Sequence, residues 1–163
     1  MVRILYVIMF IMYLSVNGCS QEQENTPEKE EQSGTMRTIM AVGDSLTAGY
    51  GLDESESYPT LLEKKLQAAG YNYQVVNGGV SGETSSGTLS RMEWILTLEP
   101  DIIILETGAN DGLRGVDPLV AEKNIWEILQ ILKNRDVVVL LAGMKMVWNL
   151  GPEYVSKFNS IYP

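Results

Sequence analysis

Short apolar runs alternate with longer stretches of helically spaced apolar residues from residue 38 onward. Four of the runs predict buried strands, at Thr38–Val42, Tyr73–Val76, Asp101–Leu105 and Val137–Leu141. Between them, apolar residues that recur every three or four positions predict helices over 58–69, 83–98 and 118–132, and another helix over 153–161. This alternation, with its short connections, predicts an α/β fold in which helices cover both faces of a parallel sheet.

Each predicted strand is followed by residues that could take part in binding or catalysis. Gly43-Asp44-Ser45 follows the first strand, residues 77–83 the second, residues 106–112 the third, and an apolar loop over 142–151 the fourth. Ligands of open parallel sheets bind beyond the carboxyl ends of the strands. A serine hydroxyl, a glycine amide, the Asn110 carboxamide and an apolar loop together favour acyl transfer, which needs a nucleophile, oxyanion donors and space for an acyl chain.

Each of these residues also has a plainer interpretation. Ser45 could belong to an ordinary turn or helix cap, and Gly82 could be a turn glycine. Asn110 could form an Asx-turn with its own backbone. The predicted placement of all three on one edge of the sheet, more than any single residue, favours a functional site.

The N-terminal segment has a different composition from the rest. Arg3 precedes a 13-residue apolar run over 4–16, which is typical of a secretory signal, and Cys19 follows where a lipoprotein signal is cleaved and lipidated. We therefore predict a signal peptide over 1–18, a lipidated Cys19, an acidic disordered tether over 19–35 and a folded domain over 36–163. The protein would then be an exported lipoprotein of the cell envelope, although a plain signal peptide or an uncleaved anchor is the alternative.

The charge balance limits the possible partners. Lys and Arg number 12 against 21 Asp and Glu, which gives a net charge of −9 with no basic patch, so we expect no nucleic-acid partner. One cysteine and no histidine exclude an internal disulfide and a zinc site built from Cys and His. We expect no metal or cofactor.

Three blocks in order resemble a known family. Gly43-Asp44-Ser45-Leu46, then Gly82, then Gly108-Ala109-Asn110-Asp111 are similar to the first three motif blocks of the SGNH/GDSL hydrolases, especially the bacterial arylesterase, thioesterase and lysophospholipase branch. The resemblance implies a flavodoxin-like three-layer α/β/α fold and a small acyl ester or thioester as substrate. It also implies that Ser45 is the nucleophile, and that its own N–H, the Gly82 N–H and the Asn110 side chain form the oxyanion hole.

The sequence departs from the family in its fourth block. The D-x-x-H block, which would supply the catalytic acid and base, is absent, so we expect a fifth strand, this block and a last helix to be missing. We predict that the chain itself is inactive, because a serine hydroxyl needs a base, and that its fourth strand is an aggregation-prone sheet edge. The alternatives are a non-catalytic surface lipoprotein that binds a ligand and a carbohydrate acetylesterase of the same family.

Overall fold

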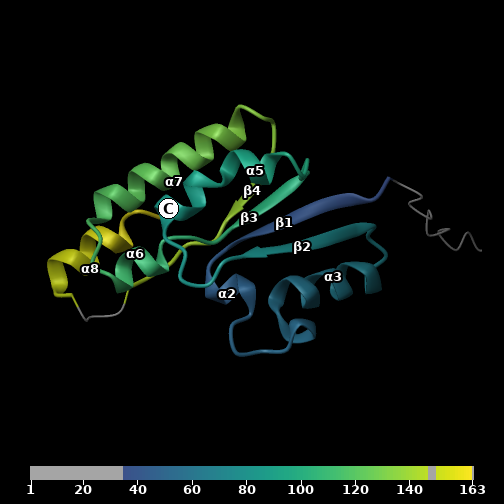
Figure 1. Cartoon of the computed structure of the whole chain (residues 1–163), viewed down its shortest axis with the longest axis horizontal. Helices are drawn as coiled ribbons and strands as arrows, with labels where there is room; N and C mark the ends of the chain where they lie inside the picture. The colour runs from purple at the N-terminus through teal and green to yellow at the C-terminus, as the bar shows by residue number, and fades with distance from the viewer. Residues whose placement is uncertain (1–34, 147–149, 163) are drawn as a thin grey trace, which may run out of the picture. The chain divides into compact units, whose positions relative to one another are not determined.

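The computed structural model describes residues 35–146 and 150–162. The predicted signal peptide, Cys19 and the tether up to residue 34 lie outside the described residues. The fold is α/β, with a sheet of four parallel strands in the order β2-β1-β3-β4 (Figure 1). The strands are β1 (Arg37–Gly43), β2 (Tyr73–Gly79), β3 (Ile102–Leu105) and β4 (Val138–Leu141), as the apolar runs predict.

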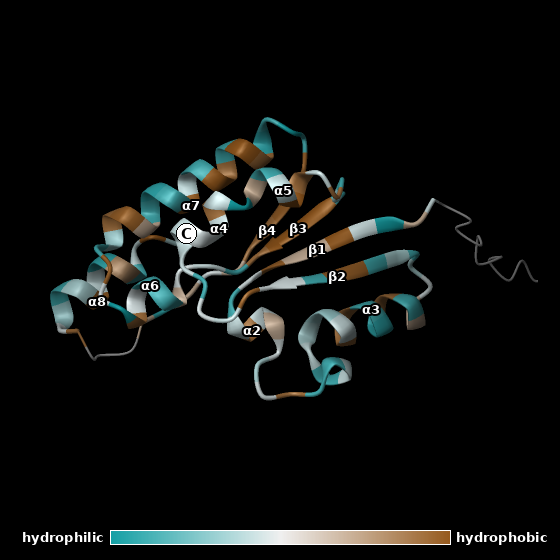
Figure 2. Cartoon of the chain, in the orientation of Figure 1, coloured by the Kyte–Doolittle hydropathy of each residue, from teal (hydrophilic) through white to brown (hydrophobic). Residues whose placement is uncertain are grey.

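Helices lie on both sides of this sheet, which makes three layers (Figure 1). On one side, α3 (Tyr58–Ala68) packs against β2. On the other side, α4 (Ser85–Ser90), α5 (Met92–Leu96) and α7 (Pro118–Lys133) cover the strands. The core on that side is formed by buried apolar side chains of β1, β3, α5 and α7, among them Met40, Ile95, Ile103, Leu105, Ile128 and Leu132. Figure 2 shows the corresponding hydrophobic colour along β1, β3 and β4.

Four short elements complete the described chain. The helices α2 (Ser45–Ala48) and α6 (Ala109–Leu113) follow the ends of β1 and β3, and η1 (Glu54–Glu56) precedes α3. The helix α8 (Pro152–Asn159) is close to the predicted helix over 153–161. Sequence patterning did not predict α2 or α6, because each is about one turn long and carries no periodic signal.

The strand β2 extends three residues beyond the predicted end at Val76. It pairs with β1 along its whole length, as far as Gly43 opposite Gly79. A side chain at Gly79 would collide with the backbone of Ala48, since an added Cβ would lie 2.6 Å from the Ala48 Cα. The glycines that predict a strand end therefore continue the strand where α2 passes close to it.

The predicted helix over 83–98 is wrong in one respect, because Arg91 divides it into α4 and α5. The Arg91 guanidinium donates to both Glu83 carboxylate oxygens at 2.7 Å and to the Gly78 carbonyl at 2.8 Å. These contacts turn Arg91 toward the end of β2. Val120, in the first turn of α7, has an exposed side chain, whereas Ile125, Ile128 and Leu132 of the same helix are buried.

The strand β4 forms one edge of the sheet, as predicted for the fourth strand. On the side away from α7, Val138 is 56% exposed and Leu140 is 61% exposed. Ile102 and Ile104 of the neighbouring β3 are partly exposed. Within the ranges that the structure covers, no helix is long and apolar enough to cross a bilayer.

Candidate active site

Ser45 lies at the carboxyl end of β1, where it opens α2. Asp44, buried to 2% exposure, caps this helix, because its Oδ1 accepts from the Leu46 N–H at 2.9 Å. Ser45 is therefore not the cap residue, and its side chain is half-buried beside the cap. Gly43 has no room for a side chain, since an added Cβ would collide with Thr47 and Glu106. This close packing fixes the turn that presents Ser45.

Asn110 lies in the first turn of α6, after the end of β3. Its Nδ2 donates to Asp44 Oδ2 at 2.9 Å, so its side chain reaches the residue next to Ser45 across 66 positions of sequence. A carboxamide nitrogen carries two N–H donors, and this bond uses one of them. The second donor can serve a ligand at the same edge.

Gly82 lies in the turn between β2 and α4, with a φ of +79°. This left-handed backbone favours glycine. Arg114, at the end of α6, donates to the Gly82 carbonyl at 2.7 Å. Arg91 holds both sides of the same turn through Gly78 and Glu83. The loop with Gly82 is thereby tied to α6, the helix that carries Asn110.

Sequence reasoning assigned no role to Glu106, which lies directly after β3 and is buried. Its Oε2 accepts from the Asp44 N–H at 3.0 Å and from Thr47 Oγ1 at 2.9 Å, so it holds residues on both sides of Ser45. Its Oε1 is buried without a hydrogen-bond partner among the described residues. Burial first, and then the nearby Asp44 carboxylate, raise the pKa of Glu106. The sequence offered one sign of this role, namely a carboxylate placed directly after an apolar strand.

A second buried network fixes α6 against α4. The Asp111 carboxylate accepts from the Ser85 N–H and from Ser85 Oγ, both at 2.7 Å. Asn124 of α7 donates to Ser85 Oγ at 2.9 Å. Because Asp111 follows Asn110, this network holds the first turn of α6, which carries Asn110. The motif Gly108-Ala109-Asn110-Asp111 includes Asp111, but its sequence alone does not predict these hydrogen bonds.

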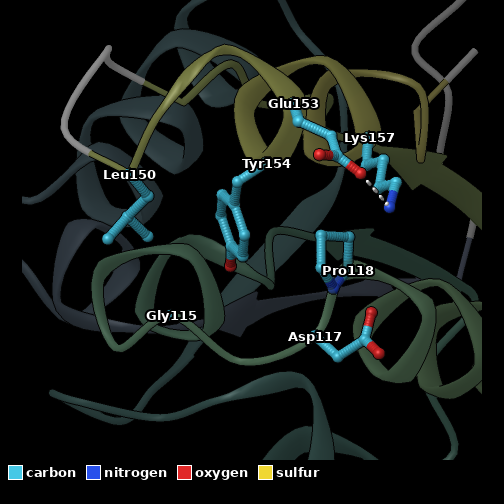
Figure 3. A pocket seen from close by; sticks show the side chains of 7 residues that line it. All are labelled: Gly115, Asp117, Pro118, Leu150, Glu153, Tyr154 and Lys157. Atoms are coloured by element: carbon cyan, nitrogen blue, oxygen red, sulfur yellow. Dashed lines mark hydrogen bonds and ion pairs between the residues drawn. The ribbon is translucent and has the colours of Figure 1, made fainter.

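A cavity of about 420 Å³ lies between the start of α7 and α8. It is lined by Gly115, Asp117, Pro118, Leu150, Glu153, Tyr154 and Lys157 (Figure 3). Tyr154 donates to the Val116 carbonyl at 2.6 Å, and Lys157 pairs with Glu153 at 2.9 Å. Neither Ser45, Gly82 nor Asn110 lines this cavity. Among the residues with described positions, no group of three or more Asp, Glu, Cys or His could hold a metal ion.

The fold and this edge define a class of protein, namely α/β proteins with a serine at the end of the first parallel strand and polar groups of neighbouring strand ends around it. The model of the GDSL-like lipase/acylhydrolase family matches residues 41–161. The chain belongs to this family, as its three motif blocks indicate.

Individual relatives agree with this assignment. The esterase TesA of Pseudomonas aeruginosa is 39% identical over 132 residues, which cover 80% of this chain and 66% of TesA. The thioesterase 1/protease 1/lysophospholipase L1 of Escherichia coli is 38% identical over 127 residues, which cover 77% of this chain and 60% of that protein. A solved SGNH-hydrolase family esterase, AlinE4, superposes with a TM-score of 0.76 at 45% identity over 80% of this chain and 70% of its own. The chain thus spans about two thirds of the length of these relatives.

Proposed function

We propose that residues 36–163 carry the nucleophile and the oxyanion donors of a serine carboxylic ester hydrolase. Ser45 is the nucleophile, and its own N–H, the Gly82 N–H and the second Asn110 N–H stabilise the oxyanion. The observation that carries the proposal is the hydrogen bond between Asn110 and Asp44, because Asp44 precedes Ser45 and the bond uses only one of the two Asn110 amide N–H donors. The names of the relatives, an esterase and a thioesterase/lysophospholipase, support acyl esters or thioesters as substrates.

The reaction needs one group more than these residues supply. Ser45 Oγ attacks the acyl carbon while a base takes the hydroxyl proton, and the carbonyl oxygen gains the negative charge that the three N–H donors receive. The alcohol or thiol leaves with a proton, and water then releases the acid from the acyl-serine. The 163 residues contain no histidine, and a general base typically contributes about 10²–10⁴-fold. We therefore propose that this chain alone hydrolyses esters at a negligible rate.

A chimera tests the assignment of Ser45. Residues 36–163 are joined to the part of AlinE4 that follows the matched region, and hydrolysis of p-nitrophenyl esters of graded chain length is compared with release of acetate from acetylated sugars. We expect hydrolysis of short-to-medium acyl esters that Ser45→Ala abolishes. Asn110→Ala should lower kcat by about 10²–10³-fold, the typical effect of removing one oxyanion donor.

Two controls accompany this experiment. Ser55→Ala, at an exposed position in η1, should leave the rate unchanged. The unextended 163-residue chain should give only the background rate of its own Ser45→Ala variant. A chimera that keeps its activity without the Ser45 hydroxyl would show that another residue is the nucleophile.

The same proposal includes export and a lipid anchor at Cys19. It rests on the sequence of residues 1–35, which lies almost entirely outside the described residues. Membrane fractionation and metabolic labelling with a radioactive fatty acid test it in a bacterial host. We expect label and membrane association in the natural chain and loss of both in Cys19→Ser, whereas an unlabelled membrane-bound chain would indicate an uncleaved anchor.

A further inference from the structure

Large apolar side chains are exposed around Ser45. We call them the apolar rim, and they are Leu46, Tyr50, Leu52, Val80 and Leu113. Leu46 is 67% exposed and Tyr50 is 82% exposed. Single exposed apolar residues are common on proteins, but a group of them around one site marks a surface that binds a partner.

Backbone hydrogen bonds place the rim residues next to the same turn. Tyr50 N–H donates to the Ser45 carbonyl at 3.0 Å, and Val80 N–H donates to the Gly43 carbonyl at 2.8 Å. Leu46 follows Ser45 directly. Leu113 belongs to α6, whose Asn110 contacts Asp44. Three separate segments next to the Ser45 turn thus carry exposed apolar residues.

The loop over 49–53 projects two of these side chains. Gly49 and Gly51 have φ values of +77° and +85°, and the Leu52 N–H donates to the Gly49 carbonyl at 3.0 Å. Nothing lies within 4 Å of a Cβ added at Gly51, so the loop is open there. Figure 2 shows it extending away from the sheet between α2 and α3, with a hydrophobic segment along it. A defined turn therefore carries Tyr50 and Leu52 outward.

The charges beside the rim restrict its partner. Asp53, Glu54 and Glu56 follow Leu52 and are exposed. They outnumber the two cations beside the rim, which are Lys64, whose ammonium donates to the Ser55 carbonyl, and Arg114, which follows Leu113. This acidic flank repels anionic lipid headgroups, which attract Lys and Arg instead. Tyrosine is enriched at the interface between lipid and water, where its ring is buried and its hydroxyl remains hydrated.

We propose that the apolar rim docks on the surface of a zwitterionic phospholipid bilayer. Tyr50 and Leu52 enter the headgroup region, and the opening at Ser45 then faces the lipid, so an acyl ester could enter the site without crossing water. This inference rests on the proposed function and concerns how an acyl ester reaches Ser45. The docking itself needs no catalysis, so it can fail while Ser45-dependent hydrolysis stands, and the reverse.

Hydrogen exchange detected by mass spectrometry tests the docking in the full 163-residue chain with phosphatidylcholine vesicles. If the apolar run over 4–16 holds every variant on the vesicles, the readout is which part of residues 36–163 is protected. We expect severalfold slower exchange in peptides over 46–53 on adding vesicles. Vesicles with added phosphatidylglycerol should protect these peptides less.

Two variants separate the rim from other exposed apolar residues. The double variant Tyr50→Ser/Leu52→Ser should lose the protection, and Leu46→Ser should weaken it. The matched control Trp94→Ser/Trp126→Ser alters two residues of similar exposure on α5 and α7 and should keep it. All of these positions are exposed, and circular dichroism verifies the fold.

Three results would overturn the proposal. One is an absence of protection, another is protection that persists in the Tyr50/Leu52 double variant, and the third is protection centred on 138–141, which would assign lipid contact to the uncovered face of β4. Stronger protection by the anionic vesicles would overturn the assignment to zwitterionic lipid.

Discussion

The carboxyl edge of the sheet and the uncovered face of β4 reverse the usual distribution of polar and apolar groups. At the edge, carboxylates are buried, with Asp44 at 2% and Asp111 at 1% exposure. On β4, Val138 and Leu140 are exposed by more than half. The buried carboxylates accept short hydrogen bonds, while among the described residues no helix covers the apolar pair.

This contrast separates two physical demands. Buried polar groups require their partners, because an unpaired one pays the full cost of desolvation. An exposed apolar side chain costs the folded monomer little, but it provides area and an open strand edge for association. We therefore expect substitutions at the edge to affect unfolding and substitutions on the β4 face to affect self-association.

The largest effect should come from the two faces of the β3–β4 pair. Ile103 is fully buried against α5 and α7, so Ile103→Ala should lower the free energy of unfolding by about 2–5 kcal/mol. Leu140→Ala, on the open face, should change it by no more than about 0.5 kcal/mol. Urea denaturation followed by circular dichroism measures both. Equal losses would mean that Leu140 is covered in solution.

The second prediction concerns the edge network. Asp111→Ala leaves the Ser85 N–H and Oγ without their acceptor, which should cost about 1–3 kcal/mol of unfolding free energy, since each buried donor loses its partner. Asp53→Ala is the control, because this exposed carboxylate makes no capping hydrogen bond. Urea denaturation gives the difference, and a loss in Asp111→Ala no greater than in the control would show that the network contributes nothing.

The sequence predicted the regular elements far better than these networks. The periods of the apolar residues located β1, β3, β4, α3 and α7, because those periods depend on one face being buried. The common edge of Ser45, Gly82 and Asn110 followed from parallel strands alone. The Ser85–Asp111–Asn124 network joins residues 26 and 39 positions apart, and no local pattern encodes such a contact.

The site itself was predicted in the same uneven way. Motif order identified Ser45, Gly82 and Asn110 as candidates, but not the groups that hold them. Glu106 accepts from Asp44 and Thr47, and Arg114 donates to Gly82, so these contacts join segments that follow different strands. Such pairings depend on the register of the sheet, which sets which strand ends face each other and which short helices follow them.

The third prediction uses the pH dependence of Glu106, whose raised pKa reflects burial and the Asp44 charge. The folded state keeps the Glu106 proton to a higher pH than the unfolded state does. The stabilisation that this proton gives is complete below the usual pKa of 4.5 and is lost as the pH rises through the pKa of the folded state. Glu106→Gln cannot lose a proton and keeps an acceptor oxygen for Asp44 and Thr47. It should flatten the decline of stability above about pH 4.5.

Urea denaturation over a pH series measures this slope, with Asp44, Tyr58 and Tyr162 as the titratable groups that face Glu106. Asp101→Asn is a control of opposite sign. The hydrogen bond from the Thr38 N–H is the largest cause of the lowered pKa of Asp101. The stabilisation from the Asp101 carboxylate is therefore present above the usual pKa of 3.8 and is lost as the pH falls through the pKa of the folded state. An unchanged slope in Glu106→Gln would assign the pH dependence to another group.

The smallest effect on folding, and the most specific one, should come from a charge on the β4 face. Leu140→Lys changes the unfolding free energy by no more than about 0.5 kcal/mol, because the side chain is exposed. It should nevertheless reduce self-association, since a lysine on an edge strand prevents pairing with a second sheet. Sedimentation velocity over a range of concentrations measures this on residues 36–163, which lack the apolar run over 4–16.

Val139→Lys is the matched control, because Val139 packs against the core and its replacement should unfold the domain instead. If Leu140→Lys associates as strongly as the natural sequence, the open face of β4 is not the surface through which the domain associates, and the exposed apolar rim around Ser45 becomes the stronger candidate.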